Sequence, residues 1–230
     1  MQQHDNAHAT TAESRGLLKS YLRRRYTILF YTLLLTLVSA PVLSALKFTG
    51  TLLELLLAAS LFAAIMPVTS VRSRPYLLVA MIIVWLARPM TVWLKHLFFS
   101  KMTLGIWTLV GLLAAAAALR FAMAATQVDA EHLYAALSAY LLAGIYFGLF
   151  YWVLEQMIPG TFTSNGSFSQ TSAIYFSFVT LATLGYGDIA PHGDIARGIA
   201  IVEGVGGQLF LAVLVARLVS LYSKPTGQAS

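Results

Sequence analysis

Six consecutive residues in the C-terminal third of the chain, Thr183-Leu184-Gly185-Tyr186-Gly187-Asp188, are suited to presenting backbone oxygen atoms to a cation. The glycines on either side of Tyr186 can adopt backbone conformations that are closed to other residues. Successive carbonyl groups of such a segment can therefore point to one side. Four copies around an axis would stack these carbonyls into oxygen rings that replace the hydration shell of a potassium ion, and the Thr183 hydroxyl would add a further ring.

A Gly-Tyr-Gly triplet by itself is more often a simple turn, so this interpretation depends on the surrounding elements. Residues 159–194 are interrupted by Gly, Asn, Ser and Pro too often for a full membrane span, yet residues 168–182 are apolar. We predict a short helix over 168–182 that enters the membrane partway, after which the chain returns. Non-helical backbone at membrane depth is tolerated only where it is buried in protein or lines a water-filled cavity. The segment is therefore expected to line a cavity.

Composition places the remainder of the chain in a membrane. Hydrophobic residues make up 58% of the 230 residues and charged residues 10%, against roughly 25% charged residues in a soluble domain. A bilayer core needs about 20 apolar residues of helix. Arg88-Pro89 interrupts one of the runs that reach this length. We predict an all-α membrane protein with six spans, at residues 26–46, 51–71, 76–94, 103–125, 133–158 and 195–222.

The distribution of positive charge predicts the orientation, because Lys and Arg favour cytoplasmic loops. Charges on one side of the six spans are Lys19, Arg23, Arg24, Arg25, Arg72, Arg74, Arg120 and Lys224; the exceptions are Lys47, Lys95, Lys101 and Arg197. We therefore expect both termini in the cytoplasm of a bacterial inner membrane. The expected divisions are a tail (1–25), a four-helix membrane domain (26–125), a pore domain (131–222) and a second tail (223–230).

The sequence from Ala173 to Pro191 resembles the pore helix, filter and exit turn of the potassium channel family, in its bacterial type. The resemblance implies that Thr183, Leu184, Gly185 and Tyr186 bind K⁺ through their carbonyls. It implies that Tyr175 and Phe176 brace this filter from behind and that Asp188 forms a hydrogen bond near its outer mouth. Two residues depart from the common family pattern: Leu184 replaces Val, and Ala182 replaces Thr.

The last predicted span carries three glycines near its middle, Gly204, Gly206 and Gly207. The resemblance implies a gating hinge at Gly207, with Gly206 beside it, whereas close packing against the pore helix explains the same residues equally well. Glu203 is costly inside a bilayer, and we favour a hydrogen bond from it to the back of the pore helix over a role in ion occupancy or pH response. Glu155 is expected to anchor the outer loop.

Taken together, these features predict a homotetrameric channel in the lipid bilayer that conducts K⁺ passively and needs no cofactor. A voltage sensor needs several basic residues at three-residue spacing, but residues 103–125 contain only Arg120, so no voltage gating is expected. An unseen regulatory partner is one candidate for the control of gating. The basic residues form no common face that could bind nucleic acid, so no such partner is expected. The alternatives are a nonselective cation channel and a pore-loop subunit of a cation transporter. No paired carboxylates or His cluster support an enzyme.

Overall fold

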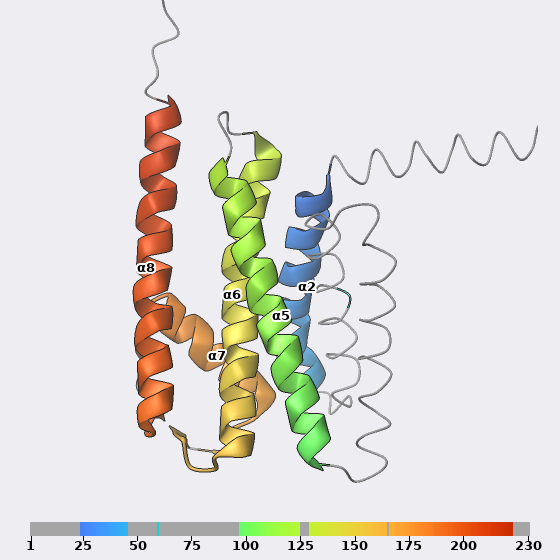
Figure 1. Cartoon of the computed structure of the whole chain (residues 1–230), viewed down its shortest axis with the longest axis vertical. Coiled ribbons are helices and arrows are strands. Elements are labelled where there is room, and N and C mark those ends of the chain that lie inside the picture. The colour runs from blue at the N-terminus through green and yellow to red at the C-terminus, as the bar shows by residue number, and fades with distance from the viewer. Residues whose placement is uncertain (1–23, 46–58, 60–96, 125–128, 165, 223–230) are drawn as a thin grey trace, which may run out of the picture.

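The computed structural model describes residues 24–45, 59, 97–124, 129–164 and 166–222. Long helices run alongside one another, and the short helix α7 lies between α6 and α8 (Figure 1). Two short strands flank α7 in the sequence. In chain order, the elements are α2 (Arg25–Ala45), α5 (Leu97–Ala124), α6 (Ala130–Met157), β1 (Phe162–Ser164), α7 (Gln170–Leu181), β2 (Ile189–Pro191) and α8 (Asp194–Tyr222).

The described residues confirm a mostly helical protein with helices that suit a membrane. Three stretches are long and apolar enough to cross a bilayer, namely Met102–Ala124, Ala130–Met157 and Asp194–Ser220. A shorter apolar stretch covers Arg25–Ser39 in α2. The predicted spans at 51–71 and 76–94 lie outside the described residues, so the total of six spans stays a prediction.

Helix α6 is the central element of this bundle and packs against α2, α5, α7 and α8. Its contact with α5 is made largely of small side chains. Because alanine leaves little bulk between helices, their backbones can approach closely in a membrane. The buried alanines at this contact are Ala114, Ala115, Ala118 and Ala122 of α5 and Ala135, Ala136 and Ala139 of α6.

Asp129 caps the N-terminus of α6. Its side chain accepts a hydrogen bond from the backbone N–H of His132, one of the donors that a helix start leaves without an internal partner. This bond favours the ionised carboxylate and lowers the pKa of Asp129 below its usual value. The central helix therefore begins at a fixed residue.

The strands connect the chain before α7 to the chain after the candidate site. β1 and β2 are antiparallel, with Phe162 opposite Pro191 and Ser164 opposite Ile189. Glu155, near the end of α6, accepts hydrogen bonds from the backbone N–H groups of Gly160 at 2.8 Å and Phe162 at 3.0 Å. The anchoring expected of Glu155 is thus present. The chain before α7 and the chain after the candidate site are thus held together at one end of the bundle.

Candidate ion-binding site

The segment after α7 has a repeating backbone conformation. Thr183, Gly185 and Gly187 have positive φ angles of 56°, 57° and 79°, whereas Leu184 and Tyr186 between them do not. In an ordinary strand the side chains and carbonyls alternate between opposite sides. Reversing the hand of every second residue turns successive carbonyls toward one side. The pattern therefore suits the predicted row of oxygens, and glycine serves at two of the three left-handed positions.

Thr183 is the β-branched residue in this pattern, and positive φ in such a residue costs about 1–3 kcal/mol. Backbone hydrogen bonds from the end of α7 hold this region. The Thr183 N–H donates to the Thr180 carbonyl at 3.0 Å, and the Leu184 N–H donates to the Val179 carbonyl at 2.8 Å. The start of the segment is thus fixed to the last turn of α7.

The same segment is poorly covered by its own subunit. The side chains of Leu184 and Tyr186 are 56% and 65% exposed. Residues 183–188 are all exposed. Irregular backbone is not stable in contact with lipid, because its polar groups lack hydrogen-bond partners there.

Tyr175, one of the residues expected to support the segment, lies beside it. The rings of Tyr175 and Tyr186 are stacked, with centroids 6.5 Å apart and planes 7° apart. The Tyr175 hydroxyl interacts with the carboxylate of Asp188. Tyr175 therefore contacts two residues in the second half of the segment, Tyr186 and Asp188.

The contacts of Phe176 within the subunit lie elsewhere on α7, and its predicted support of the filter stays a prediction. Its ring is buried and lies edge-on to Tyr151, at 5.1 Å between centroids, and to Phe162, at 5.4 Å. Successive residues of a helix point about 100° apart, so Tyr175 and Phe176 leave α7 in different directions. Within the subunit, Phe176 supports α7 against α6 and β1.

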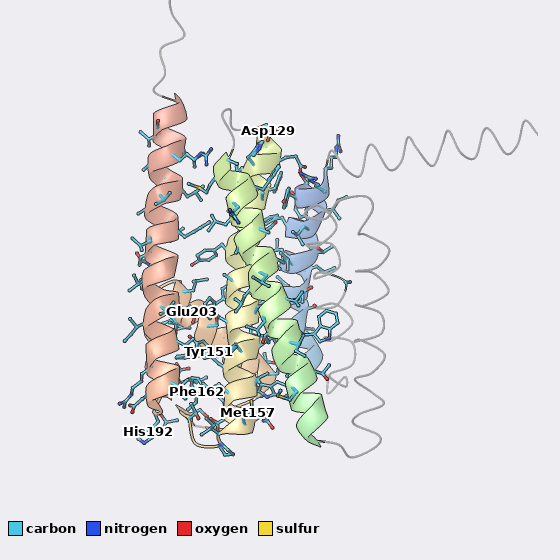
Figure 2. The ribbon with its side chains drawn as sticks, viewed as in Figure 1. Asp129, Tyr151, Met157, Phe162, His192 and Glu203 are labelled. Carbon is cyan, nitrogen blue, oxygen red and sulfur yellow. The ribbon has the colours of Figure 1, made fainter. Side chains whose placement is uncertain are left out.

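Glu203 is buried behind α7, 1% exposed, and its neighbours come from two other helices. The Tyr151 hydroxyl of α6 donates to Glu203 Oε2 at 2.6 Å, and the Ser177 hydroxyl of α7 is hydrogen-bonded to Glu203 Oε1. Ser177 Oγ also lies 2.7 Å from the Gly144 carbonyl oxygen. Figure 2 shows Glu203 and Tyr151 at a similar height in the bundle. The expected hydrogen bond to the pore helix is present, and Tyr151 is a partner that the sequence did not indicate.

The glycines of α8 make different contacts. A Cβ atom added at Gly207 would lie 2.5 Å from the Leu181 carbonyl oxygen, whereas one added at Gly206 would meet nothing within 4 Å in the subunit. At Gly204 the nearest atom would be the Thr180 carbonyl oxygen at 3.6 Å. This close contact with Leu181 supports the interpretation that Gly207 allows α8 to pack against α7. Its role as a hinge stays a prediction.

Gln208 was missed by sequence reasoning. Its Nε2 atom donates to Thr183 Oγ1 at 3.2 Å. The signal that could have indicated it is a lone amide side chain directly after the glycine cluster, near the middle of a membrane span. Such a residue needs a polar neighbour in a membrane.

The long apolar helices, the short helix α7 and the exposed segment that follows it suit a membrane protein with a loop between its last two long helices. In agreement, a family model described as "Ion channel" matches residues 137–224, which include α7, the site and α8. No solved structure matches the chain significantly.

Three characterised relatives were compared with the chain. An inward rectifier potassium channel, Kirbac3.1 of Paramagnetospirillum magnetotacticum, is 34% identical over 91 residues, 38% of this chain and 28% of the relative. Two pore potassium channel c of Oryza sativa subsp. japonica is 37% identical over 91 residues, 39% of this chain and 18% of the relative. Protein LctB of Bacillus caldotenax is 29% identical over 100 residues, 40% of this chain and 74% of that protein.

The chain thus spans less than a third of the length of the first two relatives. Together with the family match, these likenesses support a pore-loop potassium channel family for the C-terminal part of the chain. For the matched residues, they indicate a channel and not an enzyme.

Proposed function

We propose that this protein is a subunit of a potassium-selective channel, in which Thr183, Leu184, Gly185 and Tyr186 bind K⁺ through backbone carbonyls. The observation that carries the proposal is the alternation of positive φ angles at Thr183, Gly185 and Gly187. Carbonyls on one side of a strand substitute for the water that a cation loses on entering a narrow pore. The ion channel family match and two relatives named as potassium channels support the same substrate.

The active form is proposed to be a homotetramer. One chain supplies one return segment, and four copies around an axis complete rings of oxygen ligands. The exposed Leu184 and Tyr186 side chains would then be covered by neighbouring subunits and not by lipid. The pore would follow the axis along α8.

The orientation and gating are also proposals. Helices α2 and α6 begin at the end of the bundle where α5 and α8 finish (Figure 1). Arg24 and Arg25 precede or begin α2, Arg120 lies near the end of α5, and Arg217 near the end of α8. We place this positively charged end in the cytoplasm. Because Arg120 is the single basic residue of 103–124, conduction should depend little on voltage.

The test is ion flux through the purified protein in liposomes with a potassium gradient, a sodium gradient as comparison, and Ba²⁺ as a blocker. The expected result is Ba²⁺-sensitive flux of K⁺ that is lost in Gly185→Asp. Position 185 has φ +57° and nothing within 4 Å of an added Cβ, so the variant acts on the backbone and on charge beside the ion path rather than on packing.

A matched control is Gly198→Ala in α8, where φ is ordinary and an added Cβ also meets nothing within 4 Å. Its flux should equal that of the native protein. Equal flux of Na⁺ and K⁺ would contradict potassium selectivity and favour a nonselective cation channel. Absence of any flux from native protein in both gradients would contradict the proposed channel activity.

A further inference from the structure

The amide of Gln208 and the hydroxyl of Thr183 connect α8 directly to the first residue of the proposed filter. Nε2 of Gln208 donates to Oγ1 of Thr183 at 3.2 Å, across 25 residues of sequence. Both side chains are exposed within the subunit. The contact therefore lies at a surface of the subunit and not in its packed interior.

Neighbouring contacts fix the position of Gln208 along α7. A Cβ atom at Gly204 would lie 3.6 Å from the Thr180 carbonyl oxygen, and one at Gly207 would lie 2.5 Å from the Leu181 carbonyl oxygen. Residues 204 and 208 share a helix face. The end of α7 therefore runs alongside α8, with Thr180 near Gly204 and Leu181 near Gly207. The absence of a side chain at Gly207 allows the close approach. Gln208 then comes opposite Thr183.

Thr183 needs such support because it is a β-branched residue with φ +56°. This conformation is unfavourable by about 1–3 kcal/mol. Inside the described subunit its backbone N–H is bonded to the Thr180 carbonyl. The bond from Gln208 adds a restraint on the side chain and hence on the position of the hydroxyl oxygen.

We propose that Gln208 is a positioning residue that holds the Thr183 hydroxyl in place at the inner end of the filter, and thereby sets how tightly a dehydrated divalent cation binds there. The inference rests on the proposed function, in which four Thr183 hydroxyls form one oxygen ring. Preorganised ligands bind a cation more tightly than ligands that must first be ordered. With the amide donor removed, the hydroxyl is free to rotate.

Ba²⁺ is the probe, because it has nearly the size of K⁺ and twice its charge. The variant is Gln208→Met, which keeps the length of the side chain and removes its N–H donor. We expect the Ba²⁺ concentration for half-block of K⁺ flux, with Ba²⁺ inside the liposomes, to rise about threefold to tenfold, the factor that one lost hydrogen bond produces. Leu209→Met, at the adjacent exposed position, is the matched control and should leave it unchanged.

A second substitution separates a positional effect from general disruption. Valine has the shape of threonine but no hydroxyl. In a Thr183→Val background, Gln208→Met should therefore cause no additional change in the Ba²⁺ concentration for half-block, since coupled residues act non-additively. Gln208→Glu should lower the half-blocking concentration, because a ring of carboxylates attracts a divalent cation.

The results distinguish the two proposals. Native protein without Ba²⁺-sensitive K⁺ flux contradicts the proposed function, and the present inference fails with it. Native protein with such flux, together with a Gln208→Met half-block within twofold of native, contradicts the role of Gln208 alone. Should Gln208→Met not assemble, Gln208→Asn tests the same contact, because its shorter side chain does not reach Thr183 Oγ1.

Discussion

Helices α6 and α8 have similar lengths and hydrophobicity but very different surroundings. In the most apolar 18-residue window of each helix, 56% of residues are buried in α6 and 11% in α8. α6 contacts α2, α5, α7 and α8, whereas α8 meets the rest of the described subunit mainly through α7, β2 and one face of α6. The subunit therefore has a side around α6 that is packed within the subunit and a side along α8 that is left exposed. We call them the completed side and the uncompleted side.

This difference shows how the polar groups of the subunit are distributed. Where α8 meets α6 and α7, Glu203 is buried and hydrogen-bonded to the buried side chains of Ser177 and Tyr151. On the uncompleted side, the return segment exposes its side chains and carries the reversed backbone conformations. The packed side holds α7 in place, and the exposed side presents the groups that we propose to bind ions. Residues that connect these sides should have the largest effects when changed.

Gly207→Ala is expected to have the largest effect, because Gly207 joins α8 to the end of α7. Its new Cβ would lie 2.5 Å from the Leu181 carbonyl oxygen, which is backbone and can move only with α7. Overpacking of this kind costs about 1–3 kcal/mol. A shift of the conducting conformation by ~1.4 kcal/mol lowers its population relative to the nonconducting one about tenfold. K⁺ flux in liposomes should fall by that factor.

Gly206→Ala is the control, since an added Cβ there meets nothing within 4 Å in the subunit. The two glycines also separate packing from bending. Alanine at either position stiffens the helix by a similar amount. If flux fell equally in both variants, the hinge interpretation would replace the packing interpretation.

Glu203→Ala should have the second largest effect, which we expect on the stability of the contact of α8 with α6 and α7. Alanine removes the acceptor of the buried Tyr151 hydroxyl, and an unsatisfied buried group costs about 1–3 kcal/mol. The melting midpoint in detergent should fall by about 2–4 °C for each kcal/mol.

Glu203→Gln is the matched variant for this site. Its carbonyl accepts from Tyr151, and its amide N–H donates to Ser177 Oγ, whose own proton then serves the Gly144 carbonyl. We expect it to keep most of the native midpoint. A midpoint of Glu203→Ala equal to that of the native protein would mean that the hydrogen bonds of Glu203 contribute nothing to holding α8.

The sequence predicted the elements on both sides better than the contacts between them. Length and hydrophobicity indicated the helices now observed at α2, α5, α6 and α8 to within a few residues, apart from the start of α5 at Leu97. Residues 168–182 were predicted as the pore helix, and α7 covers Gln170–Leu181. Strands β1 and β2 were not predicted, because three residues carry too little periodicity to reveal a strand.

Side-chain partners depended on helix rotation and register, which a single sequence does not specify. Glu203 was assigned to the pore helix because a buried carboxylate needs a donor. Its second partner, Tyr151, comes from a helix whose facing residues cannot be read from hydrophobicity alone. Phe176 was assigned to the filter by resemblance, and its contacts with Tyr151 and Phe162 within the subunit were not foreseen. Gln208 was missed because its partner, Thr183, depends on the register between α7 and α8.

Single cysteines should sharpen the comparison with the least change to the protein. The chain contains no cysteine, so an introduced thiol has no competitor. We expect at least one of the exposed α8 variants Val213→Cys, Val215→Cys and Val219→Cys to form disulfide-linked dimers in the membrane. One thiol per subunit joins subunits only in pairs, and its partner must approach with Cα atoms about 4.4–6.8 Å apart. Reduced variants should retain K⁺ flux within twofold, since exposed substitutions change stability by about 0.5 kcal/mol or less.

Ala139→Cys in α6 is the control, because Ala139 is buried within the subunit. This variant should remain monomeric on a nonreducing gel under the same oxidation. The decisive comparison is between the two helices in one experiment. Dimers from α8 and not from α6 would mean that the uncompleted side is covered by another copy of the chain. Monomers at every α8 position, in protein that still conducts K⁺, would assign that side to lipid and require a different arrangement of subunits around the filter.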